Sequence, residues 1–286
     1  MNILAIDIGG TKFSMALFDG DRITRRESRE TDREGGREWM MERVTSIARS
    51  WQSSAGVDRC GIGFGGPVFF KQQRIALSTH VGGWSDAQLA ADLERALAIP
   101  CIMDNDANVG GLGEAVYGAG RGFDPLLYVT LSTGIGGGII IGGGIFRGAD
   151  SYAGEIGHTV VRPDGPPCLC GWRGCFERVC GGLWLERDHG KSARELVEDQ
   201  AFVDRYVIDL AAGLKTGIML LNPARIVIGG GIAKTGDSLL APLRRELRRQ
   251  ITSWSQARID VVPAELEDDS VLWGALALAK KHAVGP

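Results

Sequence analysis

The feature that most constrains the fold is a unit of strand, glycine-rich turn and strand that occurs twice in the chain. The first copy reads AIDIGGTKFSMALFDG and begins at Ala5, and the second reads TLSTGIGGGIIIGGG and begins at Thr130. Self-similarity of this kind indicates an internal duplication. Because both copies lie among alternating strands and helices, we predict an α/β protein of two similar lobes with a cleft between them.

Hydrophobic periodicity predicts the other elements. Strands are expected over 3–8 and 13–19 and in the stretches RCGIGFGG, PCIMDND, RIVIGGG and IDVVPA. Helices are expected over 37–51, 85–98, 107–117, 202–221, 237–254 and 270–282. This order divides the chain into a small N-terminal lobe, residues 1–107 with 268–286, and a large C-terminal lobe, residues 108–267.

Charge and hydropathy exclude several classes of protein. The chain has 286 residues and a formal net charge of −3, which provides no positive surface for nucleic acid. No apolar run approaches ~18 residues without charges or glycine clusters, which excludes a membrane span. Asp7 and the absence of a basic region before the first apolar stretch argue against a signal peptide. We therefore expect a cytoplasmic enzyme that binds neither nucleic acid nor membranes.

Three glycine-rich turns that follow strands are candidates for binding phosphate. A P-loop or a Rossmann fingerprint would lead from the turn into a helix, whereas the first two turns here lead back into strands. Backbone N–H groups and a threonine hydroxyl in such turns can hold an anion, and a carboxylate where strand meets turn can hold Mg²⁺ through water. Tight hairpins without a ligand remain the alternative. The candidates are Asp7, Gly9, Gly10, Thr11 and Lys12, then Thr133 and Gly134, then Gly230 and Gly231.

The chain resembles the ROK family of sugar kinases, within the actin-like ATPase superfamily. DIGGTK, DNDANVGGLGE, STGIGGG, GEIGH, CLCGWRGCFE and IVIGGG occur here in the family's order, and the resemblance runs from residue 3 to about 280. It implies two actin-like (ribonuclease H-like) lobes and the ATP- and Mg²⁺-dependent phosphorylation of a hexose.

The resemblance also assigns roles to polar residues. It implies that Asp106 is the general base and that Asn105 binds the sugar, with Asp104 as a cap or a support. Glu155, His158 and Glu177 are implied to contact sugar hydroxyls, and the backbone around Gly66 to close one side of the sugar. The stretch GFGGPVF departs from the family pattern, because Pro67 is displaced and Phe69 stands near the position of an acid.

Three cysteines within eight residues, Cys168, Cys170 and Cys175, indicate a metal site or free loop thiols. The resemblance implies a zinc site with His158, ten positions upstream, as the fourth ligand. Three thiolates and one imidazole would close a tetrahedral shell, which is typical of structural zinc. One ring nitrogen of His158 would then bind metal and leave the other for the sugar.

The favoured function is that of a glucokinase acting as a homodimer. N-acetylmannosamine, N-acetylglucosamine and fructose remain alternative acceptors, because all would use the same anchors. A sugar-responsive regulator without catalysis is an alternative of a different class. It would need a DNA-binding domain, for which we expect no room before the first strand at about Ile3.

Overall fold

The computed structural model describes residues 1–78, 81–252 and 257–282. Its strands are β1 (Asn2–Ile8), β2 (Lys12–Asp19), β3 (Arg22–Glu30), β4 (Arg59–Phe64), β5 (Val68–Phe69), β6 (Arg74–Ile75), β7 (Cys101–Asn105), β8 (Leu126–Leu131), β9 (Ile135–Ile141), β10 (Gly144–Ile145), β11 (Arg225–Gly229) and β12 (Val261–Pro263). Its α-helices are α1 (Gly36–Ala55), α2 (Leu89–Leu97), α3 (Asp106–Tyr117), α4 (Phe176–Cys180), α5 (Gly182–His189), α6 (Ala193–Leu196), α7 (Gln200–Leu221), α8 (Asp237–Gln250) and α9 (Ser270–His282). Short 3₁₀ helices are η1 (Phe70–Gln72), η2 (Ile156–His158), η3 (Ala233–Thr235) and η4 (Glu267–Asp269).

The chain divides into two compact units. The first contains Met1–Val116, Arg147–Ala153 and Asp269–Pro286, and the second contains Tyr117–Phe146 and Gly154–Asp268.

The first unit is built on a five-stranded sheet with the order β3-β2-β1-β4-β7. The hairpin of β1 and β2 is antiparallel, whereas β1, β4 and β7 run parallel to one another. Parallel strands bring their carboxyl ends to one edge of a sheet. The chain segments that follow Ile8, Phe64 and Asn105 therefore leave the sheet at the same edge.

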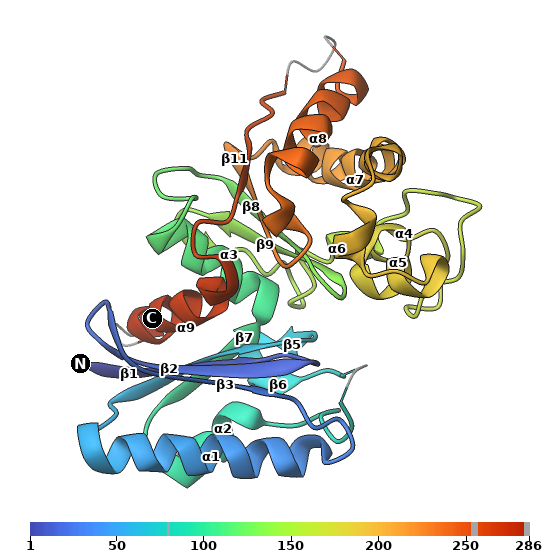
Figure 1. The fold of residues 1–286 in the computed structure, drawn as a ribbon. Coiled ribbons are helices and arrows are strands. Elements are labelled where there is room, and N and C mark those ends of the chain that lie inside the picture. Colours follow the sequence, from blue (N-terminus) through green and yellow to red (C-terminus); the bar gives the residue numbers. More distant parts are fainter. Residues whose placement is uncertain (79–80, 253–256, 283–286) are drawn as a thin grey trace. The chain divides into compact units, whose positions relative to one another are not determined.

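Helices cover both faces of this sheet (Figure 1). On one face, α1 buries the apolar stripe that its periodicity predicts: Met40, Val44, Ile47, Ala48 and Trp51. On the other face α9 lies so close that a Cβ added at Gly61 of β4 would be 2.0 Å from the carbonyl oxygen of Ala275. The sheet is thus buried on both sides, as its mostly apolar strands require.

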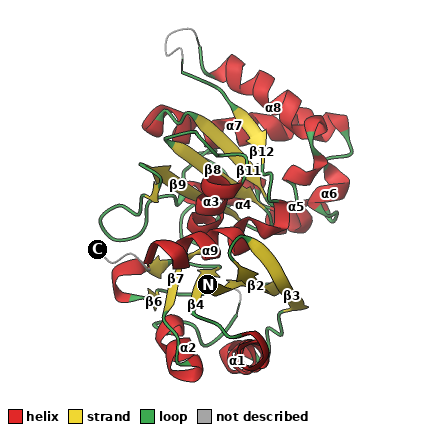
Figure 2. Cartoon of the chain, turned by 90° about the vertical axis from the view of Figure 1, so that its left-hand side faces the viewer, coloured by secondary structure: helices red, strands yellow, loops and turns green. Residues whose placement is uncertain are grey.

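The second unit repeats the plan of the first. Its sheet has the order β10-β9-β8-β11-β12, with an antiparallel β8–β9 hairpin and parallel β8, β11 and β12 (Figure 2). Strands β8 and β9 correspond to the hairpin of β1 and β2, and β10 corresponds to β3. The parallel strands β11 and β12 correspond to β4 and β7. The internal duplication predicted from the two glycine turns is therefore confirmed.

The units differ from the expected lobes at two places. Helix α3 stays with the first unit as far as Val116, because it packs against α9: a Cβ added at Gly113 would lie 2.2 Å from the Ser270 carbonyl oxygen. Residues 147–153 also belong to the first unit, although we expected them in the second lobe. Arg147 and Ser151 explain this placement, because they bind Asp104 and the Phe70 backbone of the first unit.

Three helix boundaries also differ from expectation by four residues. Helix α1 ends at Ala55, whereas the sequence predicted an end at Trp51. Helix α2 begins at Leu89, four residues later than predicted, and Asp86 adopts a left-handed conformation (φ 61°) that cannot continue a helix. Helix α8 ends at Gln250, and the predicted end at Trp254 lies outside the described residues. Among the residues the structure describes, no helix is long and apolar enough to cross a membrane.

Candidate functional site

At the carboxyl edge of the first sheet, the predicted base and sugar residues lie beside the first glycine turn. The Gly65 N–H donates to the Ile8 carbonyl oxygen at 2.8 Å, and the Asn105 side-chain amide donates to the Gly66 carbonyl oxygen at 3.1 Å. A Cβ added at Gly65 would lie 3.5 Å from both Asp106 Oδ2 and the Gly9 Cα. The ends of β1, β4 and β7 therefore bring the predicted residues of this unit into one place.

Asp106 is the first residue of α3 and is half-buried. Its Oδ1 accepts the Ala107 N–H at 2.8 Å and the Asn105 amide at 3.1 Å. The other oxygen, Oδ2, is the one that faces the glycines. One oxygen is thus held in place by hydrogen bonds, and the second lies beside Gly65, which neighbours Gly9 of the first glycine turn.

The turn of residues 9–12 is closed by its own backbone. The Gly9 N–H donates to the Lys12 carbonyl oxygen at 3.0 Å, and the Thr31 hydroxyl donates to the Gly9 carbonyl oxygen at 3.0 Å. Thr11 and Lys12 are exposed, whereas Asp7 is half-buried on β1. Arg33 Nε donates to the Gly10 carbonyl oxygen at 3.0 Å, which brings a second cation to the predicted phosphate turn.

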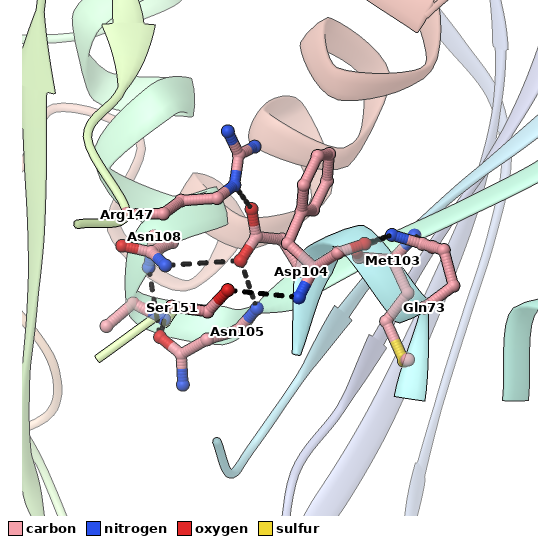
Figure 3. Close-up of polar contacts among 9 residues, drawn as sticks. Gln73, Met103, Asp104, Asn105, Asn108, Arg147 and Ser151 are labelled. Carbon is pink, nitrogen blue, oxygen red and sulfur yellow. Dashed lines mark hydrogen bonds and ion pairs between the residues drawn. The ribbon is translucent and has the colours of Figure 1, made fainter. Parts of the chain in front are cut away.

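Asp104 supports this edge from within the core, in agreement with the second of its predicted roles. Its carboxylate is 1% exposed and accepts the Asn105 N–H and the Asn108 amide (Figure 3). It also forms an ion pair with Arg147, at 2.7 Å. Burial raises the pKa of Asp104, and the charge and hydrogen bond of Arg147 oppose that rise.

In the second unit, the other two predicted phosphate turns lie side by side. They follow the neighbouring parallel strands β8 and β11. The Ile232 N–H donates to the Leu131 carbonyl oxygen at 3.1 Å, and a Cβ added at Gly230 (φ 87°) would lie 2.3 Å from that oxygen. Only glycine satisfies both the conformation and the close approach. Thr133 and Gly134 therefore share an edge with Gly230 and Gly231.

Glu177, a predicted sugar residue on α4, binds the turn of residues 132–135. Its Oε2 accepts the Ile135 N–H at 2.9 Å, and a Cβ added at Gly134 would lie 2.5 Å from the same oxygen. The Leu183 N–H also donates to the Thr133 carbonyl oxygen at 2.9 Å. This link between α4 and a phosphate turn was not foreseen in the sequence.

The three predicted sugar residues of this unit lie within electrostatic range of one another. Burial raises the pKa of the Glu155 carboxyl, the His158 ring acts to lower it, and the Glu177 carboxylate acts to raise it. Glu155 directly precedes η2, which ends at His158, and Glu177 Cβ is 3.4 Å from the position of a Cβ added at Gly157. The chain thus gathers two carboxyls and one imidazole in one place.

The four predicted zinc ligands converge in the second unit. Their ligand atoms all lie within 4.8 Å of one another, with 3.9 Å between Cys168 Sγ and His158 Nδ1 and 3.6 Å between Cys170 Sγ and Cys175 Sγ. With Zn–S bonds of ~2.3 Å, the edge of a tetrahedral shell is ~3.8 Å. Both the donor set and its spacing therefore suit a zinc ion.

Two arginines anchor the loop that carries these ligands. Arg162 makes a two-pronged ion pair with Asp209 of α7, at 2.8 and 2.5 Å. Arg178 makes another with Asp188 of α5, at 2.7 and 3.1 Å, and also donates to the Pro167 carbonyl oxygen. The loop is thus attached to two helices independently of any metal.

Sequence reasoning missed Arg147, Asn108, Gln73 and Arg33 as parts of this arrangement. A signal existed for Asn108, because it lies only four positions after Asp104, in the first turn of the helix that follows the strand. For Arg147 and Arg33, the sequence holds no comparable signal, since their partners are 43 and 23 positions away.

Comparison with known proteins supports the family resemblance. The sequence model of the ROK family matches residues 3–282. A glucokinase from Thermotoga maritima is 30% identical over 100% of this chain and 99% of its own length. An N-acetylmannosamine kinase from Shigella flexneri is also 30% identical, over 98% of this chain and 99% of its own length. A xylose repressor from Bacillus subtilis is 26% identical over 84% of this chain, with 64% of the repressor covered.

Solved structures agree with the fold class. A ROK hexokinase from Thermus thermophilus has a TM-score of 0.84 and 31% identity, with 100% of both chains covered. A ROK-family glucokinase from Streptomyces griseus, solved with glucose and AMPPNP, has a TM-score of 0.86 and 27% identity over 98% of this chain and 100% of that one. The predicted α/β class with two actin-like lobes is thereby confirmed.

Proposed function

This chain belongs to the ROK family and is an ATP-dependent sugar kinase, and we propose that glucose is its acceptor and Asp106 its general base. The observation that carries the proposal is the placement of Asn105 and Asp106 at the carboxyl edge of three parallel strands, beside the first glycine turn. The carboxylate of Asp106 has one oxygen fixed by hydrogen bonds and the other beside Gly65, which in turn lies next to Gly9.

The proposed reaction is an in-line phosphoryl transfer. A sugar hydroxyl oxygen forms a bond to the γ-phosphorus of ATP while the bond from that phosphorus to the bridging oxygen breaks, and ADP leaves. Asp106 accepts the hydroxyl proton, and Asn105 orients the sugar. Such a transfer depends chiefly on alignment and on stabilisation of charge, and little on covalent chemistry by the protein. Glu155, His158 and Glu177 are the further residues proposed to bind sugar hydroxyls.

The three glycine turns are proposed to hold the nucleotide. Backbone N–H groups at residues 9–12, 133–134 and 230–231, with the hydroxyls of Thr11 and Thr133, suit phosphate oxygens. Asp7 would hold Mg²⁺ through water, and that ion would neutralise charge on the phosphates. Arg33 lies beside the first turn and adds positive charge there.

Zinc is proposed as a structural ion held by His158, Cys168, Cys170 and Cys175. Burial raises the pKa of the Cys175 thiol to about 12, so a cation would be needed to hold it as a thiolate at neutral pH. With four protein ligands no position is left for substrate, which excludes a Lewis-acid role for this ion. Its proposed role is to order the segment between Glu155 and Glu177.

The test is an ATP-coupled assay of the whole chain with glucose, N-acetylmannosamine, N-acetylglucosamine, fructose and mannose. We expect the highest kcat/KM with glucose. A preference for an N-acetylhexosamine or for fructose would reject the proposed acceptor but keep the kinase. Sugar binding without turnover on any acceptor would favour the regulator.

We also propose that the enzyme works as a homodimer in the cytoplasm, as the resemblance to the ROK family implies. Light scattering coupled to size exclusion checks the assembly. A single species of 30.6 kDa at micromolar concentration would contradict the dimer.

A further inference from the structure

A buried ion pair stands directly behind the proposed catalytic residues. Asp104 is the last residue but one of β7 and lies two positions before Asp106, and its Oδ2 accepts Arg147 Nε at 2.7 Å. Its Oδ1 accepts the Asn105 N–H at 2.8 Å and the Asn108 amide at 3.1 Å (Figure 3). The carboxylate is 1% exposed and the Arg147 side chain 22%. A carboxylate buried so deeply keeps its charge only where a cation and donors surround it.

Arg147 belongs to the segment of residues 147–153, and both Arg147 and Ser151 of this segment contact Phe70. The Arg147 guanidinium lies 3.5 Å from the centroid of the Phe70 ring, and the Phe70 N–H donates to the Ser151 hydroxyl at 3.2 Å. Gln73 joins the Phe70 loop to β7, because its side chain donates to the Phe70 and Met103 carbonyl oxygens and accepts the Met103 N–H. Residues 147–153 and the strand that carries Asp104 are thus parts of one polar network.

We propose that Arg147 is a positioning residue for phosphoryl transfer: through Asp104 it fixes the backbone of Asn105 and the start of α3, and hence the orientation of Asp106. The proposal rests on the function proposed above. It assigns Arg147 no contact with either substrate. The residue acts through Asp104, and its segment leads directly into Gly154 and Glu155, the first of the proposed sugar residues of the second unit.

Removal of the arginine has a definite physical consequence. Asp104 would remain buried with its negative charge unpaired, and that state is unfavourable. Either the carboxyl takes up a proton or the strand end moves to find water. Both changes disturb the oxygen that accepts the Asn105 N–H and the Asn108 amide, and displacements of about 1 Å in a reacting group can cost about a hundredfold in rate.

The experiment compares Arg147→Met, Arg147→Lys, Asp104→Asn and the double variant Asp104→Asn/Arg147→Met in the full chain, with kcat and both KM values measured. For Arg147→Met we expect kcat to fall by about a hundredfold while the KM for ATP changes little. Arg147→Lys should recover part of the loss, because it keeps the charge but lacks the planar stacking on Phe70. The double variant should exceed Arg147→Met in kcat, because it leaves no unpaired buried charge.

Arg74→Met is the matched control. Arg74 also pairs with an aspartate, Asp86, and lies 4.5 Å from the centroid of a phenylalanine ring, Phe69, but the structure assigns it no bond to Asp104. Its kcat should stay near that of the wild type. Far-UV circular dichroism and the Tm of each variant show whether it folds, and if Arg147→Met does not, Arg147→Lys and the double variant carry the comparison.

Two results would overturn the inference. One is a wild-type kcat in Arg147→Met or, if that variant does not fold, a wild-type kcat in Arg147→Lys. The other is a double variant whose loss in kcat equals the product of the two single losses, because independent effects would show that Arg147 does not act through Asp104. A wild-type chain that phosphorylates no hexose would instead overturn the proposed function.

Discussion

Substitution of Gly134 by alanine tests the link between the turn of residues 132–135 and α4. The new Cβ would lie 2.5 Å from Glu177 Oε2, closer than non-bonded atoms approach, and 3.2 Å from Glu177 Cδ, which is a tight contact. The carboxylate must therefore move, although it is held by the Ile135 N–H at 2.9 Å. No left-handed backbone conformation is involved at Gly134, so the effect comes from this contact.

The magnitude follows from the hydrogen bond that is lost. A bond from a backbone N–H to a charged group contributes about 2 kcal/mol, which corresponds to a fall in Tm of about 5 °C for a protein of this size. Since Thr133 is assigned to phosphate and Glu177 to sugar, KM should rise for both substrates. Thermal unfolding and steady-state kinetics measure the two effects on the same preparation.

Two further variants are measured for comparison with Gly134→Ala. Gly82→Ala is the control, because a Cβ there meets no atom within 4 Å and the backbone is not left-handed. Glu177→Gln keeps an oxygen that can accept the Ile135 N–H and should lower the Tm less than Gly134→Ala does. A Gly134→Ala variant with the Tm and both KM values of Gly82→Ala would refute the reasoning.

Two other predictions concern the metal loop and the helix contact of the first unit. Elemental analysis should find about one zinc per chain in the wild type. Cys168→Ser should lose the ion and sugar binding. Its far-UV circular dichroism should be mostly retained, because Arg162 and Arg178 still anchor the loop. A metal-free preparation that phosphorylates sugar normally would contradict this. Gly274→Ala should lower stability by about 3 kcal/mol or prevent folding, because its Cβ would lie 1.7 Å from the Val109 carbonyl oxygen of α3, a backbone atom that cannot give way. Thermal unfolding checks it, and a Tm equal to that of Gly82→Ala would show that the helices can separate.

Local patterns were sufficient to predict most of the fold. The stripe of Met40, Val44, Ile47, Ala48 and Trp51 follows from helical period alone, and the buried face of α1 consists of those residues. The start of α2 was wrong, because the left-handed residue Asp86 carries no signal that distinguishes it from the helical N-terminus we expected at Ser85.

The candidate site was predictable where residues follow strand ends. The pattern of the sequence placed Asn105 and Asp106 at the end of a strand that leads into a helix, and the resemblance to the ROK family supplied their predicted roles. Arg147 and the role of Glu177 in the second turn could not be foreseen. Each depends on a partner more than 40 positions away, Asp104 at 43 and Ile135 at 42, which only the folded chain brings near.

The central claim is tested most directly by the turnover of Asp106→Asn with ATP and glucose. A general base contributes ~10²–10⁴-fold, so kcat should fall by at least about a hundredfold. Affinity for glucose should stay near that of the wild type, because an amide keeps the shape and one acceptor oxygen. Asp106→Asn that retains more than about a tenth of the wild-type kcat would show that the proton goes to another group and would contradict the account.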